Sequence, residues 1–284
     1  MEASSCNTEA QALLTSTGWL KIHTDAASLA SRRRLAKRQA EYGVESRTLS
    51  VAETQSLEPA LADGLAGAIF YPEVMSLRSP QRAIESLARR FTSDGSAFTQ
   101  DEVTAIGQSG TAAWIETAGA GRQIFDYIVI ACGAWSAPFA AMVGERLCLK
   151  AERGYHVMLY HPPLPLTRPV TVSSPGYTIA PMQDGLRIAS GVEFASLSAP
   201  PDLRRIQAMA RHATTIVDGL DPAPKAEWLG FRPSMPNSIP VLRRARRNHR
   251  IVLAFGHGHL GVTLGPHEAG RIAALIEAPA TSVV

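Results

Sequence analysis

Apolar residues along the chain are spaced in two ways, one typical of strands and one typical of helices. Tyr127–Ala131 is an uninterrupted apolar run, as expected of a strand covered on both faces, and Ile251–Phe255 has the length and composition of a strand. Pro80–Thr92 has apolar residues at helical spacing after Ser79, an N-cap residue type, and predicts an amphipathic helix. Helices are also predicted over Ala26–Tyr42 and Val51–Leu57, and strands over Trp19–His23, Gly67–Tyr71, Ala97–Ala105, Ala112–Thr117 and Gln123–Ala131.

The region from Lys150 to Leu229 alternates short strand patterns with Pro/Gly turns. Asp184-Gly185 is a hairpin signal between two of these strands. The expected strands are Tyr155–Tyr160, Val170–Ser173, Tyr177–Pro181 and Arg187–Glu193, and the helix that follows is marked by Leu203, Ile206, Ala210, Ala213 and Val217. An antiparallel sheet with one or two helices is the simplest account of this pattern.

The stretch after Ile251–Phe255 contains four glycines and then a helical pattern. Pro266 suits the first position of a helix, and Ala269, Ile272, Ala273 and Ile276 are expected to form its buried face. A helix N-terminus at a glycine turn can hold an anion or an electron-rich ring edge. The glycines at 256, 258 and 261 match G-x-G-x-x-G, but no second strand with an acidic residue follows. Two interpretations stay open: a tight turn without a ligand, or a glycine-lined wall against a flat cofactor.

Composition and charge exclude several classes of protein. The chain has 284 residues, of which 45% are hydrophobic and 19% charged, and its net charge of +3 does not by itself imply nucleic acid. Cys6, Cys132 and Cys148 are scattered, and the His257–His259 pair has no third ligand nearby, so no metal is expected. No run approaches 18 apolar residues and no signal-peptide pattern opens the chain, so a cytoplasmic setting is the default expectation.

Blocks of the sequence resemble the D-amino-acid oxidase and dehydrogenase family of FAD enzymes, above all its dehydrogenase small-subunit-like proteins. GHGHLGVTLGPHEAGRIAALI (Gly256–Ile276) resembles the family's C-terminal flavin-facing motif, and WLGFRPSMPNSIPV (Trp228–Val241) resembles its G-x-R-P segment. DYIVIACGAWS (Asp126–Ser136) resembles its second FAD-contacting strand and turn, and TGWLKIHTD (Thr17–Asp25) the opening of its substrate domain. The similarity runs from about Thr17 to the C-terminus.

The resemblance implies an α/β fold with α+β elements. It would combine an incomplete, Rossmann-like FAD-binding domain with a substrate domain built on a mixed or antiparallel sheet with flanking helices. The substrate domain is expected over 17–75 and 146–230, and the FAD-binding part over 76–145 and 231–284, with 1–16 as a tail. The implied activity is oxidation of the C–N bond of a D-amino acid or related amine to an imine and 2-oxo acid, with oxygen or a quinone as electron acceptor.

The same resemblance assigns roles to individual residues. Arg232, in GFRP, is expected to hold the substrate carboxylate, because a guanidinium is a rigid fork for bidentate binding; a structural ion pair is the alternative. Tyr155, His156 and Tyr177 are candidates for the pocket wall, and His259 either faces the substrate or only packs. The residues expected to contact FAD are Val103, Cys132, Gly133, Ala134, Trp135, Gly258, His259, Leu260, Gly261, Val262 and Thr263.

A run of arginines precedes the strand Ile251–Phe255 and leaves two interpretations open. A solvated loop is one, and peripheral attraction to anionic lipid of the inner membrane is the other, since the resembled dehydrogenases deliver electrons to the membrane. The residues are Arg243, Arg244, Arg246, Arg247 and Arg250. The expected partners are thus a small amino acid or amine and an electron acceptor, while membrane contact and oligomerisation stay open.

The sequence also departs from the family. Its members begin with a strand, a true G-x-G-x-x-G and a helix, and that first βαβ unit of roughly 30 residues is absent before Met1. We therefore expect the chain as given to bind FAD weakly or not at all. The alternative function is a non-catalytic remnant or partner subunit that keeps the substrate domain for binding or assembly.

Overall fold

Capping side chains fix the starts of α2, α3 and α4. Ser50 accepts a hydrogen bond from the Glu53 N–H, and the Glu53 carboxylate accepts one from the Ser50 N–H at 2.7 Å, which closes a capping box at α3. Asp25 caps α2, and Ser79 caps α4 just before Pro80. The helices are α1 (Thr8–Ala12), α2 (Ala26–Ala40), α3 (Val51–Leu57), α4 (Pro80–Ser93), α5 (Ser136–Met142), α6 (Arg204–Ala213) and α7 (Gly261–Glu277), with 3-10 turns η1 (Gly133–Trp135) and η2 (Gly258–Leu260).

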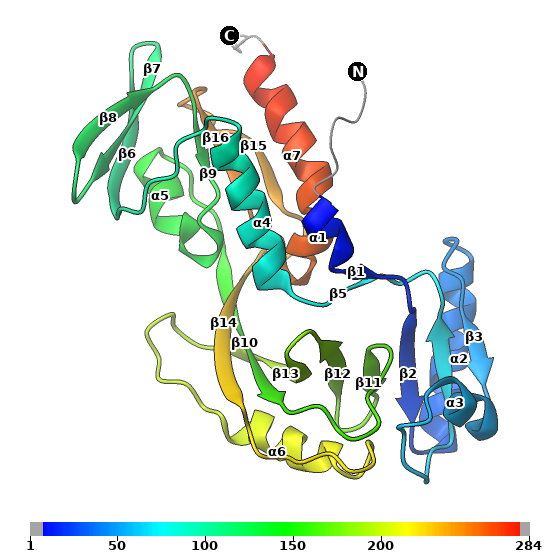
Figure 1. Cartoon of the computed structure of the whole chain (residues 1–284). Coiled ribbons are helices and arrows are strands. Elements are labelled where there is room, and N and C mark those ends of the chain that lie inside the picture. Colours follow the sequence, from blue (N-terminus) through cyan, green and yellow to red (C-terminus); the bar gives the residue numbers. More distant parts are fainter. Residues whose placement is uncertain (1–7, 279–284) are drawn as a thin grey trace. The chain divides into compact units, whose positions relative to one another are not determined.

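The computed structural model describes residues 8–278 and has a mixed α/β fold with two compact units (Figure 1). Unit 1 comprises the described residues up to Phe98, with Tyr155–Gly191 and Pro201–Leu229. Unit 2 comprises Thr99–Gly154, Val192–Pro200 and the residues from Gly230 onward. The predicted substrate and FAD-binding domains divide the chain differently, because α4 groups with unit 1; their assignment as functional domains stays a prediction, and residues 1–7 of the expected tail lie outside the described residues.

Unit 1 is organised around one large sheet. The eight-stranded sheet has the order β14-β10-β13-β12-β11-β2-β4-β3, in which strands distant in sequence are neighbours. Its strands are β2 (Trp19–His23), β3 (Arg47–Leu49), β4 (Gly67–Tyr71), β10 (Lys150–Leu159), β11 (Val170–Val172), β12 (Tyr177–Met182), β13 (Gly185–Phe194) and β14 (Ala226–Ser234); β1 (Leu14–Thr15) and β5 (Ser76–Leu77) form a separate pair. Strands β10 and β14 contribute residues to both units.

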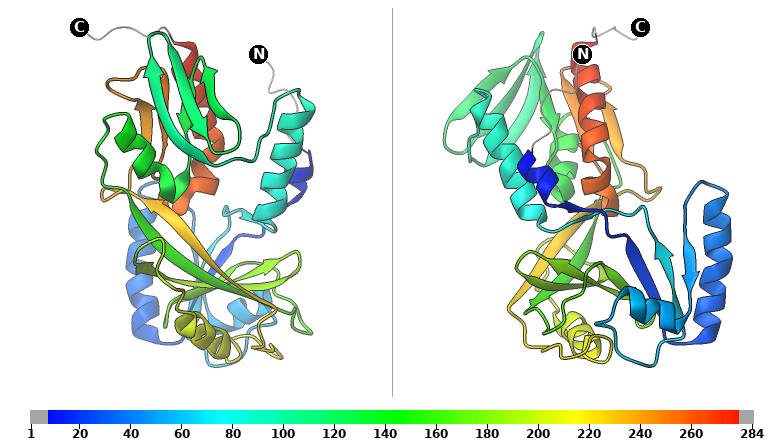
Figure 2. Two further views of the ribbon diagram at one scale, coloured as in Figure 1. Left: turned by 90° about the vertical axis from the view of Figure 1, so that its left-hand side faces the viewer. Right: turned by 45° about the vertical axis from the view of Figure 1, so that its right-hand side comes forward.

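The core of unit 1 lies between this sheet and α6. Ile179 and Ile188 are completely buried there, together with Ile206 and Ala213 from α6. Near the N-terminal end of the described residues, α2 packs Leu29 against strand β4. Figure 2 shows this helix alongside β3 and β4. The β12–β13 hairpin turns at Asp184-Gly185, as the sequence predicts.

Unit 2 has two small sheets. In one, β16 (Ile251–Phe255) lies between β15 (Val241–Arg244), which is antiparallel, and β9 (Ile128–Ile130), which is parallel. The other is a meander of β6 (Val103–Ser109), β7 (Ala112–Thr117) and β8 (Gly121–Phe125). In Figure 1 the long helix α7 runs beside β15 and β16.

Three sequence expectations about unit 2 are wrong in detail. Strand β6 begins at Val103, not at Ala97, and the strand expected over Gln123–Ala131 is two strands interrupted near Asp126. Residues of β9 are not covered on both faces, since Ile128 and Val129 are only half-buried: among the described residues β9 pairs with β16 alone.

Helix α7 also differs from expectation. It begins at Gly261, so Pro266 lies inside it and not at its first position. The expected apolar face is only partly buried, with Ala269 exposed, and the buried residue of the helix is Glu268. The apolar periodicity identified the helix correctly. The side of the helix next to strands β15 and β16, however, has Glu268 as its buried residue.

Candidate functional site

The turn between β16 and α7 requires glycine at specific positions. Gly256 has φ +94°, and a Cβ there would lie 2.7 Å from the Met235 side chain. Gly258, with φ +52°, opens the 3-10 turn η2, and Gly261 starts α7. This segment is thus a buried strand, a glycine turn and a helix N-terminus, as predicted. The positive end of the helix dipole lies at the turn.

Arg232 lies on β14, close to this turn. Two residues further along the strand, Ser234 forms an isolated antiparallel bridge with His257, which places the end of β14 against the glycine turn. The Arg232 guanidinium occupies the space where a side chain at Gly154 would lie. Because Gly154 has no Cβ, the two neighbouring strands leave room for the arginine head.

Glu152 links the two residues that the sequence singled out. Its Oε2 atom lies 2.9 Å from His259 Nε2, and the carboxylate is mostly buried, with 18% of the side chain exposed. Burial lowers the pKa of the Arg232 guanidinium, and the charge of Glu152 opposes that shift. Arg232 and His259 therefore share one acidic neighbour. Sequence reasoning missed Glu152. In β10, Glu152, Gly154 and His156 are spaced by two residues and therefore share one face of the strand.

A cavity of about 190 Å³ lies beside the glycine turn. Its walls include Glu152, His257 and His259, and the Ser234 hydroxyl at its edge is buried without a hydrogen-bond partner among the described residues. Gly258 and Leu260, both predicted to contact FAD, also line it. Val262 and Thr263 lie on the first turn of α7 and are exposed. An unsatisfied hydroxyl beside polar side chains is suited to bind a small polar ligand.

His257 has its own carboxylate neighbour. Its Nε2 atom lies 3.6 Å from Glu268 Oε2, and Arg271 Nη1 lies 3.3 Å from the other carboxylate oxygen. Nothing in the sequence singles out Glu268, because its spacing in α7 is that of an exposed position between apolar ones.

A second turn, after β9, contains the other predicted FAD contacts. Gly133 has φ +55°, and a Cβ there would meet no atom within 4 Å, so the backbone borders open space. Ala134 is buried, whereas Trp135 is 50% exposed and packs edge-on against Phe231, the neighbour of Arg232, with ring centroids 5.3 Å apart. The turns at 133–135 and 256–261 therefore both lie near β14.

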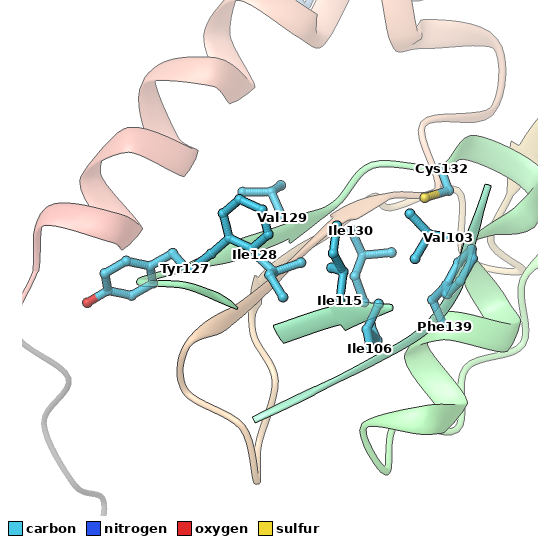
Figure 3. Close-up of a pocket in the computed structure, with 10 residues that line it drawn as sticks. Val103, Ile106, Ile115, Tyr127, Ile128, Val129, Ile130, Cys132 and Phe139 are labelled. Carbon is cyan, nitrogen blue, oxygen red and sulfur yellow. The ribbon is translucent and has the colours of Figure 1, made fainter. Parts of the chain in front are cut away.

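An apolar cavity of about 270 Å³ lies beside β9 (Figure 3). Val103 and Cys132, both predicted FAD contacts, are brought together in its wall, and Figure 3 shows them near Phe139. Burial raises the pKa of the Cys132 thiol. The remaining lining residues are Ile106, Ile115, Phe125, Tyr127, Ile128, Val129 and Ile130.

The three candidates for the pocket wall all belong to unit 1. Tyr155 is 8% exposed and its hydroxyl accepts the Asp202 N–H, while Tyr177 is 3% exposed and its hydroxyl lies 2.8 Å from His212 Nδ1. Both rings are part of the core, and burial raises the pKa of Tyr177. His156 is half-buried on the face of β10 opposite to that of Tyr155, and it lines a cavity of unit 1. Their part in substrate binding stays a prediction.

The arginine run before β16 is only partly a solvated loop. Arg243 and Arg244 lie on β15, where Arg243 donates two hydrogen bonds to Glu145 and Arg244 donates to backbone carbonyls at the end of α7. Arg250 lies over the ring of Tyr127. These intramolecular contacts weaken the lipid interpretation for three of the five arginines.

The described residues contain neither a candidate metal site nor a candidate membrane-spanning helix. Among residues 8–278 no group of three or more His, Cys, Asp or Glu side chains is arranged to hold a metal ion. In that same part of the chain no helix is both long and apolar enough to cross a membrane.

The profile of the family described as FAD dependent oxidoreductase matches residues 5–275. This chain therefore belongs to the FAD-dependent oxidoreductase family, in which the cofactor is FAD. It is 32% identical over 238 residues to the D-amino-acid oxidase of Bradyrhizobium diazoefficiens, which covers 82% of this chain and 56% of the relative. It is 29% identical to D-amino acid dehydrogenase 2 of Ralstonia nicotianae, over 94% of this chain and 66% of the relative.

A solved structure is also similar. The crystal structure of glycine oxidase from Geobacillus kaustophilus aligns with a TM-score of 0.84 and 25% sequence identity, over 95% of this chain and 74% of that protein. Of the curated relatives named above, the D-amino-acid oxidase is matched over little more than half of its own length. The family and its fold agree with the resemblance described above.

The described residues fit one part of an FAD molecule. Open space at Gly133 and the glycine turn at the N-terminus of α7 are suited to a flat ring with developing negative charge at its edge. The pyrophosphate is matched less well: the G-x-G-x-x-G at 256–261 leads into α7, and within residues 8–278 no strand follows that helix.

Proposed function

We propose that this chain oxidises the C–N bond of a D-amino acid or a related amine to an imine and then a 2-oxo acid, with Arg232 holding the substrate carboxylate. The observation that supports it most is the clustering of Arg232, Glu152 and His259 at the end of β14, next to the glycine turn. Relatives named D-amino-acid oxidase and D-amino acid dehydrogenase support the substrate class. FAD, when bound, supplies the hydride acceptor.

The residues of the chain itself would position the substrate. The Arg232 guanidinium, lying over Gly154, binds the carboxylate through two charge-assisted hydrogen bonds. Glu152 and His259 limit the space on one side of the substrate and supply polar atoms near its amine. Backbone amides at 258–263, at the positive end of α7, stabilise negative charge that develops beside them. Fixing the Cα–H direction is the main contribution of such positioning to the rate.

The substrate-carboxylate role is tested by Arg232→Gln, assayed with added FAD and an artificial electron acceptor. With D-alanine the KM should rise about 100-fold, because two charge-assisted hydrogen bonds of about 1.5 kcal/mol each are lost. Arg122→Gln, which removes a guanidinium from β8 that is 57% exposed, is the matched control and should leave KM within about twofold. An unchanged KM in Arg232→Gln would remove the assignment.

Flavin binding separates this proposal from the alternative of a non-catalytic binding or partner protein. A purified chain that takes up FAD, with quenched flavin fluorescence and turnover of D-alanine, supports an oxidoreductase. A well-folded, colourless chain that takes up no added FAD and shows no turnover supports the alternative. The choice between oxygen and a quinone follows from whether peroxide appears during turnover in air. Contact with a membrane belongs to the same proposal, and sedimentation with anionic vesicles tests it.

A further inference from the structure

A second cavity, entirely within unit 1, has the features of a ligand site. Its volume is about 510 Å³. Four segments form its wall: the β5–α4 junction, strand β10, the β12–β13 hairpin and the start of β14. Its lining residues are Arg78, Ser79, Pro80, Gln81, His156, Met158, Met182, Gln183, Asp184, Arg187, Lys225, Ala226 and Trp228. Because all of them belong to unit 1, the cavity is defined without reference to unit 2.

The charge of this cavity is positive. Arg78, Arg187 and Lys225 line it, and Asp184 is the one carboxylate among the lining residues. Lys225 Nζ donates to the Asp184 backbone carbonyl at 2.8 Å, not to its carboxylate. The ion pairs found among residues 8–278 include none of the three cations. The helix dipole of α4, whose first residue Pro80 also lines the cavity, adds to this positive potential.

Arg187 is the most informative of these cations. It lies near the start of β13 and is half-buried, and burial lowers the pKa of its guanidinium. A partly buried guanidinium without an ion pair retains a desolvation cost that an anion would relieve. Arg78 and Lys225, which line the same cavity, are exposed.

Part of the remaining wall is apolar or aromatic. The rings of His156 and Trp228 stack with centroids 4.8 Å apart and an interplanar angle of 24°. Burial, and then the charge of Arg187, lower the pKa of His156 to about 4, so the imidazole is neutral at pH 7. Met158 and the buried Met182 complete a surface suited to hydrocarbon. A ligand that satisfies both parts carries an anionic head and an apolar body.

We propose that this cavity of unit 1 binds an organic carboxylate, with the carboxylate on Arg187 and the hydrocarbon body against His156, Trp228 and Met158. A carboxylate matches the planar fork of a guanidinium. Inorganic phosphate would also satisfy the charge, but it would leave the stacked rings and the methionines without a partner. The inference is independent of the function proposed above, since it involves neither Arg232 nor the glycine turn.

The test is a binding titration with hexanoate on the full chain labelled at tryptophan, followed through the indole N–H signal of Trp228. That signal is assigned by its absence in Trp228→Phe. For a ligand of this size we expect a Kd on the order of 1 mM. Hexanamide, which has the same body without the charge, and inorganic phosphate, which has charge without the body, should each bind at least tenfold more weakly.

Three variants locate the binding. Arg187→Gln should weaken hexanoate binding at least tenfold, and Arg187→Lys, which keeps the charge but not the fork, should lie between it and the unaltered chain. Arg82→Gln removes an exposed arginine from α4 outside the cavity and should leave the Kd unchanged. Arg232→Gln should also leave it unchanged, which separates this site from the carboxylate site proposed in unit 2. A thermal midpoint for each variant shows that it is folded.

Several outcomes would overturn the inference. These are a Trp228 signal that hexanoate does not move at concentrations up to about 20 mM, or an equal Kd in folded Arg187→Gln. Phosphate binding as tight as hexanoate binding would assign the cavity to inorganic anions. Loss of hexanoate binding in Arg232→Gln with retention in Arg187→Gln would place the carboxylate in unit 2 instead.

Discussion

Two apolar strands, one from each unit, are buried to very different extents. In unit 1 the strand β12 lies between β11 and β13, and its Ile179 is completely buried. In unit 2 the strand β9 pairs with β16 alone among the described residues, and its Ile128 is half-buried beside the 270 Å³ apolar cavity. Similar apolar sequence runs therefore have different energetic roles, because the number of neighbouring strands, not the run itself, decides how much surface leaves water.

Polar contacts differ between the units in a related way. Unit 1 buries Glu58 completely, where it accepts from the Thr167 N–H at 2.9 Å and from Arg168 Nε at 3.1 Å. Unit 2 holds the loop after α5 to β15 through Glu145, which accepts from Arg243 Nη2 at 2.7 Å and from the Arg246 N–H at 2.6 Å.

Removing the charge of Glu58 should have the largest effect. Glu58→Gln leaves Arg168, only 14% exposed, without its ionic partner, and we expect the free energy of unfolding of unit 1 to fall by about 4 kcal/mol. Chemical denaturation followed by the hydrogen exchange of β4 amides measures it. The control is Glu9→Gln, in a pair with both side chains 59% exposed, which should cost at most about 0.5 kcal/mol.

Matched isoleucine truncations compare the two sheets directly. Ile179→Ala should cost about 3 kcal/mol, because a fully buried side chain is replaced by a cavity. Ile128→Ala should cost about 1 kcal/mol, since the side chain is only partly buried and lines the existing cavity. Equal costs, measured by hydrogen exchange in β12 and β9, would show that β9 is covered and would contradict the comparison.

The stability of unit 2 should depend on acid through Glu145. Hydrogen bonds from Arg243, opposed by burial, lower the pKa of Glu145 from 4.5 to about 2. A carboxyl with a lowered pKa in the folded state contributes stability that is complete above pH 4.5 and is lost as the pH falls toward 2. We expect a contribution of about 2 kcal/mol. In Glu145→Gln the difference in unit 2 stability between pH 6 and pH 3 should shrink by that amount; an unaltered pH profile would exclude the assignment.

The smallest effect concerns His156. Its pKa of about 4 is caused mainly by burial and secondly by Arg187, so Arg187→Gln should raise it without restoring the ordinary value of 6.5. Because the folded-state pKa is lowered, His156 contributes stability above pH 6.5 that is lost as the pH falls toward 4. An NMR titration of the imidazole carbon signals measures the shift. A pKa unaltered by Arg187→Gln would show that the arginine head points away from the ring.

Much of the fold could be predicted because local signals are strong. The capping residue Ser79, the hairpin at Asp184-Gly185 and the apolar run of β16 each predicted an element that the structure contains. Element ends were less predictable: α7 begins before Pro266 because the glycine turn is already helical at Gly261. Which face of α7 is buried depends on β15 and β16, which no local pattern encodes.

The site was predictable only through its motifs. Arg232 and the glycine turn were found from sequence, and the structure places the end of β14 beside that turn. Glu152 and Glu268 were not found, because a single acidic residue in a strand or a helix has the sequence appearance of a solvent-exposed position. The burial of Tyr155 and Tyr177 was also not predictable, since a tyrosine suits a pocket wall and a core equally well.

Gly154 has a consequence for how the chain tolerates mutation. The residue has no reactive group, yet any side chain there would displace the Arg232 head. In a saturation screen for function, position 154 should therefore rank among the intolerant positions, beside those that bear chemistry. The penalty should vanish in a background where residue 232 is already alanine. The two positions are therefore expected to show strong positive epistasis, because the missing side chain in one strand determines where the guanidinium of the next strand lies.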